Sequence, residues 1–210
     1  MTMQFIDHLI TDLDKALRVV SGVVFESRPS PGRGLADGVM SDAEKRHSAG
    51  LMRINNVGEV CAQALYDAQG RFAQKTEIKR QFERAGIEEE DHLAWTAQRL
   101  QELGSRTSLL NPLWYAGSYV LGTIAARVGD ARNLGFVAET ERQVELHLMS
   151  HLEQLPAQDN KSRAIVDQMR IDEIEHGEAA RVLGAAPMPA AIAGAMKAMS
   201  KVMTSVAYYI

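Results

Sequence analysis

The stretch 87-IEEEDHLAW-95 places four acidic residues directly before a histidine and a short apolar run. Residues three apart lie on the same side of an α-helix, so Glu89 and His92 are expected to face the same way. A carboxylate and an imidazole on successive turns form the Glu-x-x-His unit with which helical bundles hold a metal ion. A single unit is a weak signal, because an acidic, solvated helix face contains the same residue types.

The unit occurs a second time further along the chain. In 171-IDEIEHGEA-179, Glu173 and His176 repeat the spacing, again with an acid before the glutamate. A dinuclear bundle site combines two such units with one further glutamate from each of two other helices. The recurrence therefore predicts a glutamate-bearing helix before each unit.

The segment 54-INNVGEVCAQAL-65 supplies such a glutamate in the first half of the chain. Glu59 is surrounded by apolar residues, and it precedes Glu89 by 30 residues. An unpaired carboxylate is costly to bury, so this side chain needs a partner. The first half thus consists of a helix with Glu, a turn and a helix with Glu-x-x-His.

The second half repeats this order, with 137-VAETERQVELHL-148 as the glutamate-bearing segment. Glu141 precedes Glu173 by 32 residues and Glu145 precedes it by 28, so spacing leaves both open as the ligand. Four glutamates and two neutral histidines carry four negative charges, which two divalent ions would cancel. Nitrogen and oxygen ligands without cysteine suit iron or manganese, and the sequence does not choose between these metals.

The composition of the chain indicates an all-α protein. Helix-forming residues are abundant, and no run of alternating β-branched residues indicates a sheet. Ser41 and Glu44 match a capping box at the start of a long helix. The predicted helices cover about residues 4–22, 41–74, 77–103, 113–128, 131–155 and 161–183, with a last one after Pro189.

Several functions are disfavoured by the sequence. The 23 basic and 27 acidic residues form no basic stripe, so no nucleic-acid partner is expected. The single cysteine, Cys61, excludes an internal disulfide and a thiolate metal cluster. The glycines of 26-ESRPSPGRGLADG-38 do not fit a dinucleotide fingerprint, so no cofactor role is expected there. This loop divides an N-terminal helix and flexible loop, residues 1–40, from a bundle domain, residues 41–210.

Two segments are candidates for contact with lipid. The stretch 107-TSLLNPLWYAGSYVLGTIAA-126 carries no charge, but polar residues and glycines dilute it, so we expect a buried or lipid-touching helix and not a membrane span. The last helix has an apolar stripe that fits either core packing or an interfacial face with lysines beside it. The stripe consists of Ile192, Met196, Met199, Met203 and Val206, and the lysines are Lys197 and Lys201.

These features resemble the Coq7-type demethoxyubiquinone hydroxylase family of ubiquinone biosynthesis. The resemblance runs from about Leu51 to the C-terminus, in 51-LMRINNVGEVCAQALY-66, 88-EEEDHLAW-95, 99-RLQELGSRTSLLNPLWY-115 and 172-DEIEH-176. It implies a ferritin-like four-helix bundle with additional membrane-facing helices, in which residues 41–210 form a di-iron domain. The iron ligands that it implies are Glu59, Glu89, His92, Glu141, Glu173 and His176.

The choice of Glu141 over Glu145 depends on the resemblance. The family places this ligand six residues before a histidine, as Glu141 stands to His147, but Glu145 and His151 have the same spacing. Many relatives have His-Tyr where this chain has His147-Leu148, so no role of that tyrosine is carried over. His147 is either a residue that orients a ligand or a helix-surface histidine. No metal role is expected for the remaining histidines, His8, His47 and His151.

The activity that the resemblance implies is di-iron monooxygenation of the ring of a demethoxyubiquinol, a polyprenyl benzoquinol, with O2 as co-substrate. The reducing equivalents come from outside the chain, with NADH acting through the quinone, by transient contact or through a separate reductase. The family further implies peripheral contact with the cytoplasmic face of the inner (cell) membrane, and it allows a homo-oligomer and partner proteins of ubiquinone biosynthesis. The alternatives are a ferritin-like ferroxidase or iron-handling protein, and a metal-free helical scaffold.

Overall fold

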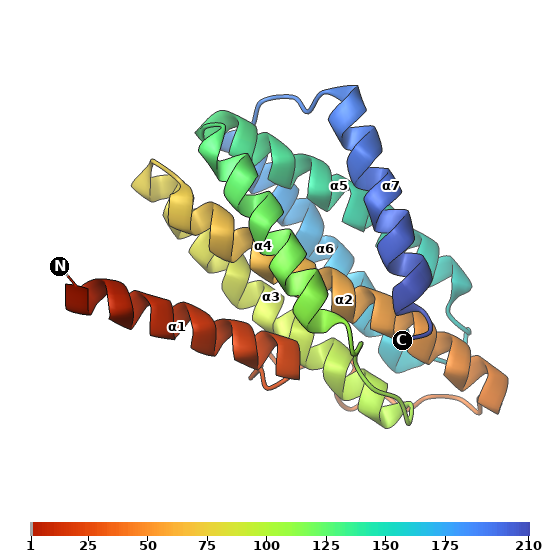
Figure 1. The fold of residues 1–210 in the computed structure, drawn as a ribbon. Coiled ribbons are helices and arrows are strands. Elements are labelled where there is room, and N and C mark those ends of the chain that lie inside the picture. The colour runs from red at the N-terminus through yellow and green to blue at the C-terminus, as the bar shows by residue number, and fades with distance from the viewer. Residues whose placement is uncertain (1) are drawn as a thin grey trace.

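The computed structural model describes residues 2–210, with the side chains of residues 2–9 and 12 left undescribed. Over the described residues the chain forms seven helices and no strand, which confirms the all-α prediction (Figure 1). Their ends lie within two residues of the predicted ones. The helices are α1 Thr2–Ser21, α2 Asp42–Phe72, α3 Thr76–Glu102, α4 Asn111–Arg127, α5 Asp130–Gln154, α6 Asn160–Val182 and α7 Ala190–Ala207.

Four long helices, α2, α3, α5 and α6, form the bundle. Helix α2 packs along α3 and α5 packs along α6, while α3 lies against α6. Each of the two hairpins is therefore a helix with Glu followed by a helix with Glu-x-x-His, as the repeat in the sequence predicts. The predicted capping box is present at the start of α2, because the Ser41 backbone N–H donates to Glu44 Oε2 at 2.7 Å and the Glu44 N–H donates to Ser41 Oγ at 3.3 Å.

Different parts of the chain cover two sides of the bundle. Helix α4 packs across α2 and reaches α5, α7 packs on α2 and α5, and α1 packs on α4 and α2. These three helices lie on the near side in Figure 1. The other side, formed by α3 and α6, is covered by the segment between α1 and α2: Trp95 Nε1 donates to the Arg28 carbonyl at 3.1 Å, and Asn160 Nδ2 donates to the Ala36 carbonyl at 2.8 Å.

Two apolar cores fill the bundle, and all four bundle helices contribute to each of them. Burial of these side chains is the main favourable term in folding. The first core includes Met52, Trp95, Leu100, Leu148, Val166 and Met169. The second includes Tyr66, Phe82, Leu134, Val137 and Ala180. Between the two cores, each bundle helix also buries glutamate or histidine side chains, and these form the site described below.

The apolar helices α4 and α7 each have a buried and an exposed side. In α4, Tyr115 and Ala126 are buried, whereas Val120 and Ile124 are more than half exposed. In α7, Met203 lies against Cys61, with the two sulfur atoms 3.6 Å apart, whereas Met199 is 53% exposed. Within the part of the chain that the structure describes, no helix is both long and apolar enough to span a membrane.

Candidate metal centre

All six side chains that the resemblance implies as iron ligands come together between the two apolar cores. Each is at most 5% exposed. Their register in the helices explains this position, because seven residues span almost two turns and keep side chains on one stripe. On α2, Glu59 lies seven residues from both Met52 and Tyr66, one residue in each core. Three of the six come from α2 and α3 (Glu59, Glu89 and His92), and three come from α5 and α6 (Glu141, Glu173 and His176).

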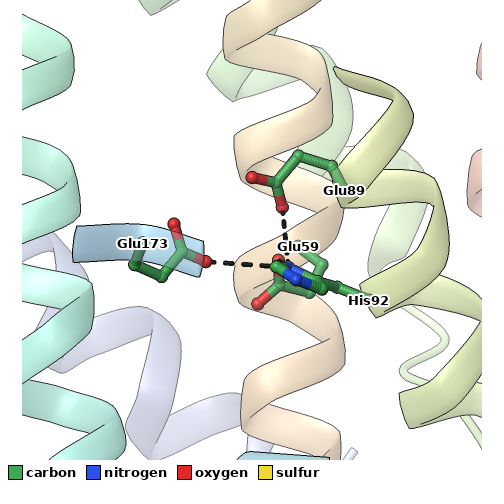
Figure 2. Close-up of side chains that lie close together, drawn as sticks. All are labelled: Glu59, Glu89, His92 and Glu173. Atoms are coloured by element: carbon green, nitrogen blue, oxygen red, sulfur yellow. Dashed lines mark hydrogen bonds and ion pairs between the residues drawn. The ribbon is translucent and has the colours of Figure 1, made fainter. Parts of the chain in front are cut away.

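The first group of ligand atoms surrounds His92 (Figure 2). The Nδ1 atom of His92 lies 3.3 Å from Glu59 Oε2, 3.4 Å from Glu89 Oε2 and 3.7 Å from Glu173 Oε1. Three carboxylates from three helices thus meet one imidazole nitrogen. This arrangement can hold one metal ion through one nitrogen and three oxygen ligands.

The second group surrounds His176. Its Nδ1 atom lies 3.3 Å from Glu89 Oε1 and 3.5 Å from Glu173 Oε2, and Glu141 completes the group. Glu89 and Glu173 therefore turn one oxygen toward each histidine. Two carboxylates lie between the two groups and could be shared by two metal ions, with Glu59 on one side and Glu141 on the other.

The hydrogen bonding of these atoms fits a bound metal. Buried polar atoms in proteins nearly always have a partner, because an unpaired one loses its hydration without compensation. Several atoms of the cluster are buried without a hydrogen-bond partner, and divalent ions between the two histidines would satisfy them. These atoms are both Glu89 oxygens, Glu141 Oε2, Glu173 Oε2 and His176 Nδ1.

Each histidine also contacts a further carboxylate through its other ring nitrogen. His92 Nε2 lies 2.8 Å from Asp172 Oδ2, and His176 Nε2 lies 2.7 Å from Glu88 Oε2. Each of these acids directly precedes the glutamate of the other histidine's unit, so the two units hold each other's histidine. A carboxylate on Nε2 fixes the ring so that Nδ1 faces a metal. Sequence reasoning missed both contacts, although the acid before each glutamate was visible.

Tyr66 is another contact residue that sequence reasoning did not single out. Its hydroxyl donates to Glu141 Oε1, and its ring meets the His176 ring edge-on with centroids 6.0 Å apart. Burial and the nearby charge of Glu141 raise the pKa of the Tyr66 hydroxyl well above its ordinary value. The hydroxyl therefore stays protonated and orients one oxygen of Glu141.

Without metal, the cluster retains protons. Burial and the neighbouring acids, Glu89 for Glu59 and Glu173 for Glu141, raise the pKa of Glu59 and of Glu141 well above 4.5. Burial opposes a charge on His92, but its hydrogen bonds to Asp172 and Glu59 outweigh this effect and raise its pKa well above 6.5. Metal ligands must be deprotonated, so metal binding would displace these protons.

The other candidate residues lie outside the cluster. Glu145, one turn beyond Glu141, belongs to neither ligand group. His147 is half-buried, its Nε2 has no hydrogen-bond partner, and its ring centroid lies 4.0 Å from that of His151, which is itself buried. His47 Nδ1 lies 2.8 Å from the Tyr208 hydroxyl. The side chain of His8 lies outside the described residues.

Two hollows lie near the cluster. A narrow crevice between α2 and α5 reaches Glu141 and Tyr66, with Leu65 and Val137 in its wall. A larger cavity of about 150 Å³ lies between α3, α6 and the segment before the bundle, and charged residues such as Arg99 line it. The crevice is too narrow for a water molecule, but its wall is mostly apolar and it ends at a candidate ligand.

Residues 46–207 match the family model described as "Ubiquinone biosynthesis protein COQ7". The chain belongs to this family. Similar curated proteins, each called "3-demethoxyubiquinol 3-hydroxylase", confirm this assignment over nearly the whole length. One from Herbaspirillum seropedicae is 82% identical over 99% of this chain and 100% of its own length. Others from Herminiimonas arsenicoxydans and Janthinobacterium sp. (strain Marseille) are 66% and 64% identical, over 97% and 99% of this chain and 97% and 100% of their own lengths.

Proposed function

We propose that this protein is a di-iron monooxygenase that hydroxylates the ring of a demethoxyubiquinol, the activity for which its relatives are named. The observation that carries the proposal is the cluster of four glutamates and two histidines, buried between two apolar cores with several atoms that lack a hydrogen-bond partner. Its nitrogen and oxygen donors suit iron. The two shared carboxylates suit a pair of ions rather than one.

The residues of the chain would hold and shield the reactive centre. Bound iron supplies the chemistry: O2 is reduced by two electrons from an outside donor, for which NADH is the candidate, and one oxygen atom enters a ring C–H bond while the other leaves as water with two protons. Asp172 and Glu88 keep the His92 and His176 rings in the orientation that points Nδ1 inward. The apolar cores above and below exclude bulk water from the centre.

The substrate would reach the centre from a membrane surface. The crevice at Glu141 lies between α2 and α5, on the side of the bundle where α4 and α7 pack. Exposed apolar residues on these helices, including Val120, Ile124 and Met199, provide an interfacial surface without a membrane span. We place this surface on the cytoplasmic face of the inner (cell) membrane.

Vesicle flotation tests this membrane contact. The double variant Ile124→Glu/Met199→Glu should no longer float with vesicles, because charges oppose insertion of both helices. Ile171→Glu is the matched control, because Ile171 is 38% exposed on α6, away from α4 and α7. Unchanged flotation of the double variant would refute the proposed surface.

Elemental analysis and an oxygen-labelling assay test the activity. The wild type should hold about two irons per chain, and it should transfer one atom of labelled O2 to a demethoxyubiquinol when a reductant is supplied. Glu141→Gln should lose at least one of the two irons and the activity, whereas Glu145→Gln, one turn away, should keep both. Iron oxidation without ring hydroxylation would favour a ferroxidase, and a wild type without stoichiometric metal would refute the metal centre.

A further inference from the structure

We propose that Arg28, which lies before the bundle in the segment between α1 and α2, is a positioning residue of the metal centre. This inference rests on the proposed metal site. Arg28 lies outside residues 46–207, the part of the chain that the family model matches. Its side chain nevertheless connects the two helices that carry the Glu-x-x-His units.

The backbone around Arg28 is fixed to α3. The Ser27 N–H donates to Asp91 Oδ1 at 2.5 Å, and the Arg28 N–H approaches the same oxygen at 3.2 Å. Trp95 Nε1 donates to the Arg28 carbonyl at 3.1 Å. Asp91 and Trp95 are 0% and 1% exposed, so these buried hydrogen bonds fix the position of the segment along α3.

The Arg28 side chain then bridges α3 and α6. Its Nε donates to Asp91 Oδ2 at 2.7 Å and its Nη2 donates to Asp172 Oδ2 at 2.9 Å. The guanidinium carbon lies 5.1 Å from the centre of the Trp95 ring, which is itself 5.4 Å from the His92 ring. The planar guanidinium can donate in two fixed directions, which a lysine ammonium group cannot reproduce.

Asp172 connects Arg28 to the ligand group around His92. The same oxygen, Oδ2, accepts from Arg28 and lies 2.8 Å from His92 Nε2, while Oδ1 accepts from Gln168 at 2.8 Å. Both carboxylate oxygens are therefore held, and the His92 ring has one favoured orientation, with Nδ1 toward Glu59, Glu89 and Glu173. Removing Arg28 would leave Oδ2 of Asp172 with His92 as its only partner, so the carboxylate would hold the His92 ring less firmly.

Anaerobic iron(II) titration against a chelating indicator tests this role, with Arg28→Gln compared with wild type. Partners that orient a metal ligand typically change metal affinity by about tenfold to a hundredfold, so we expect about tenfold weaker binding at one of the two positions. Arg33→Gln is the matched control, because Arg33 lies in the same segment and pairs with Glu26 at 2.6 Å, away from the cluster. It should bind iron as the wild type does.

Two further variants separate positioning from general destabilisation. Asp172→Asn should weaken iron binding, and adding Arg28→Gln to it should cost little more, because Arg28 acts through Asp172. Arg28→Lys keeps the charge but not the two-directional donation, so it should fold and still bind iron more weakly than wild type. Wild-type affinity in both Arg28 variants, or fully additive losses in the double variant, would overturn the inference. A wild type that binds no iron would overturn the metal centre and this inference together.

Discussion

The two Glu-x-x-His units have the same pattern in the sequence but different surroundings in the structure. The Nε2 atom of His92 contacts Asp172, whose side chain is 5% exposed and is bound by Arg28. The Nε2 atom of His176 contacts Glu88, whose side chain is 40% exposed. A repeated motif thus gives a nearly symmetrical set of buried candidate ligands, while the neighbouring segments leave the acid at His92 buried and the acid at His176 exposed.

The largest expected difference is in metal content, between a variant of a shared glutamate and a variant of an unshared one. Glu173→Ala should abolish binding at both metal positions, because its two oxygens face both histidines. Glu59→Ala should retain up to about one ion per chain, held by the His176 group. Elemental analysis after dialysis measures this difference. Equal metal contents in the two variants would show that the two groups do not load separately.

A smaller difference in metal affinity is expected between variants of Asp172 and Glu88, the carboxylates that contact Nε2 of His92 and of His176. Asp172→Asn should weaken metal binding by about tenfold to a hundredfold, the usual effect of losing a partner that orients a ligand. Glu88→Gln should have a smaller effect, because the Glu88 side chain is 40% exposed and water can reach its contact with His176. Competition with a chelator gives both affinities, and a larger loss in Glu88→Gln would contradict the contrast between the two sides.

The ligand groups around His92 and His176 should respond to pH in the same way. Folded-state pKa values are raised above 4.5 for Glu59 and Glu141 and above 6.5 for His92 and His176. Groups with raised pKa values stabilise the metal-free protein at low pH, and this stability is lost as pH rises above 4.5 for the glutamates and above 6.5 for the histidines. Glu89, whose pKa is lowered, contributes in the opposite direction.

The metal-free protein should therefore melt at a lower temperature at pH 8 than at pH 5. Iron binding should show the reverse trend and weaken at lower pH, by roughly tenfold per pH unit for each proton displaced. Calorimetric titration in two buffers with different ionisation enthalpies counts the protons. A melting temperature that rises with pH, together with an iron affinity that does not change with pH, would show that the cluster is already deprotonated without metal.

The smallest expected effect concerns the Tyr66 hydroxyl, which contacts the His176 side only. Tyr66→Phe should destabilise the metal-free protein by about 1–3 kcal/mol, because a buried oxygen of Glu141 loses its donor. Metal content should stay near that of the wild type. Tyr115→Phe is the control: it removes a hydroxyl that donates to Asp67 at 2.9 Å, away from the cluster. Denaturant unfolding measures the stability, and loss of metal in Tyr66→Phe would show that the hydroxyl is needed for binding.

The helices were predictable from the sequence because their signals are local. Ser41 with Glu44 indicates a helix start, and Gly104 and Gly184 follow α3 and α6 with positive φ values of 70° and 98°, which glycine adopts readily. The doubled Glu-x-x-His unit was also informative, because three-residue spacing places both side chains on one helix face whatever the helix packs against.

The choice between Glu141 and Glu145 shows what distinguishes a site residue within one helix. Glu141 lies seven residues from Leu134 and from Leu148, which are both 1% exposed and belong to different cores. Glu59 between Met52 and Tyr66, and Glu173 between Val166 and Ala180, have the same register. The seven-residue pattern was present in the sequence, but its meaning depends on which apolar residues are buried.

The sequence by itself determined the helices, the two hairpin halves and the candidate ligands apart from the choice between Glu141 and Glu145, because these depend on spacings within single helices and on a repeated motif. The tertiary structure alone decided which acid lies behind each histidine and that Arg28 reaches Asp172, 144 residues away. Such contacts depend on how α3 and α6 pack together and on where the segment before the bundle crosses them. Spacing along one helix carries no information about either, so two identical motifs could acquire a buried acid at one histidine and an exposed acid at the other.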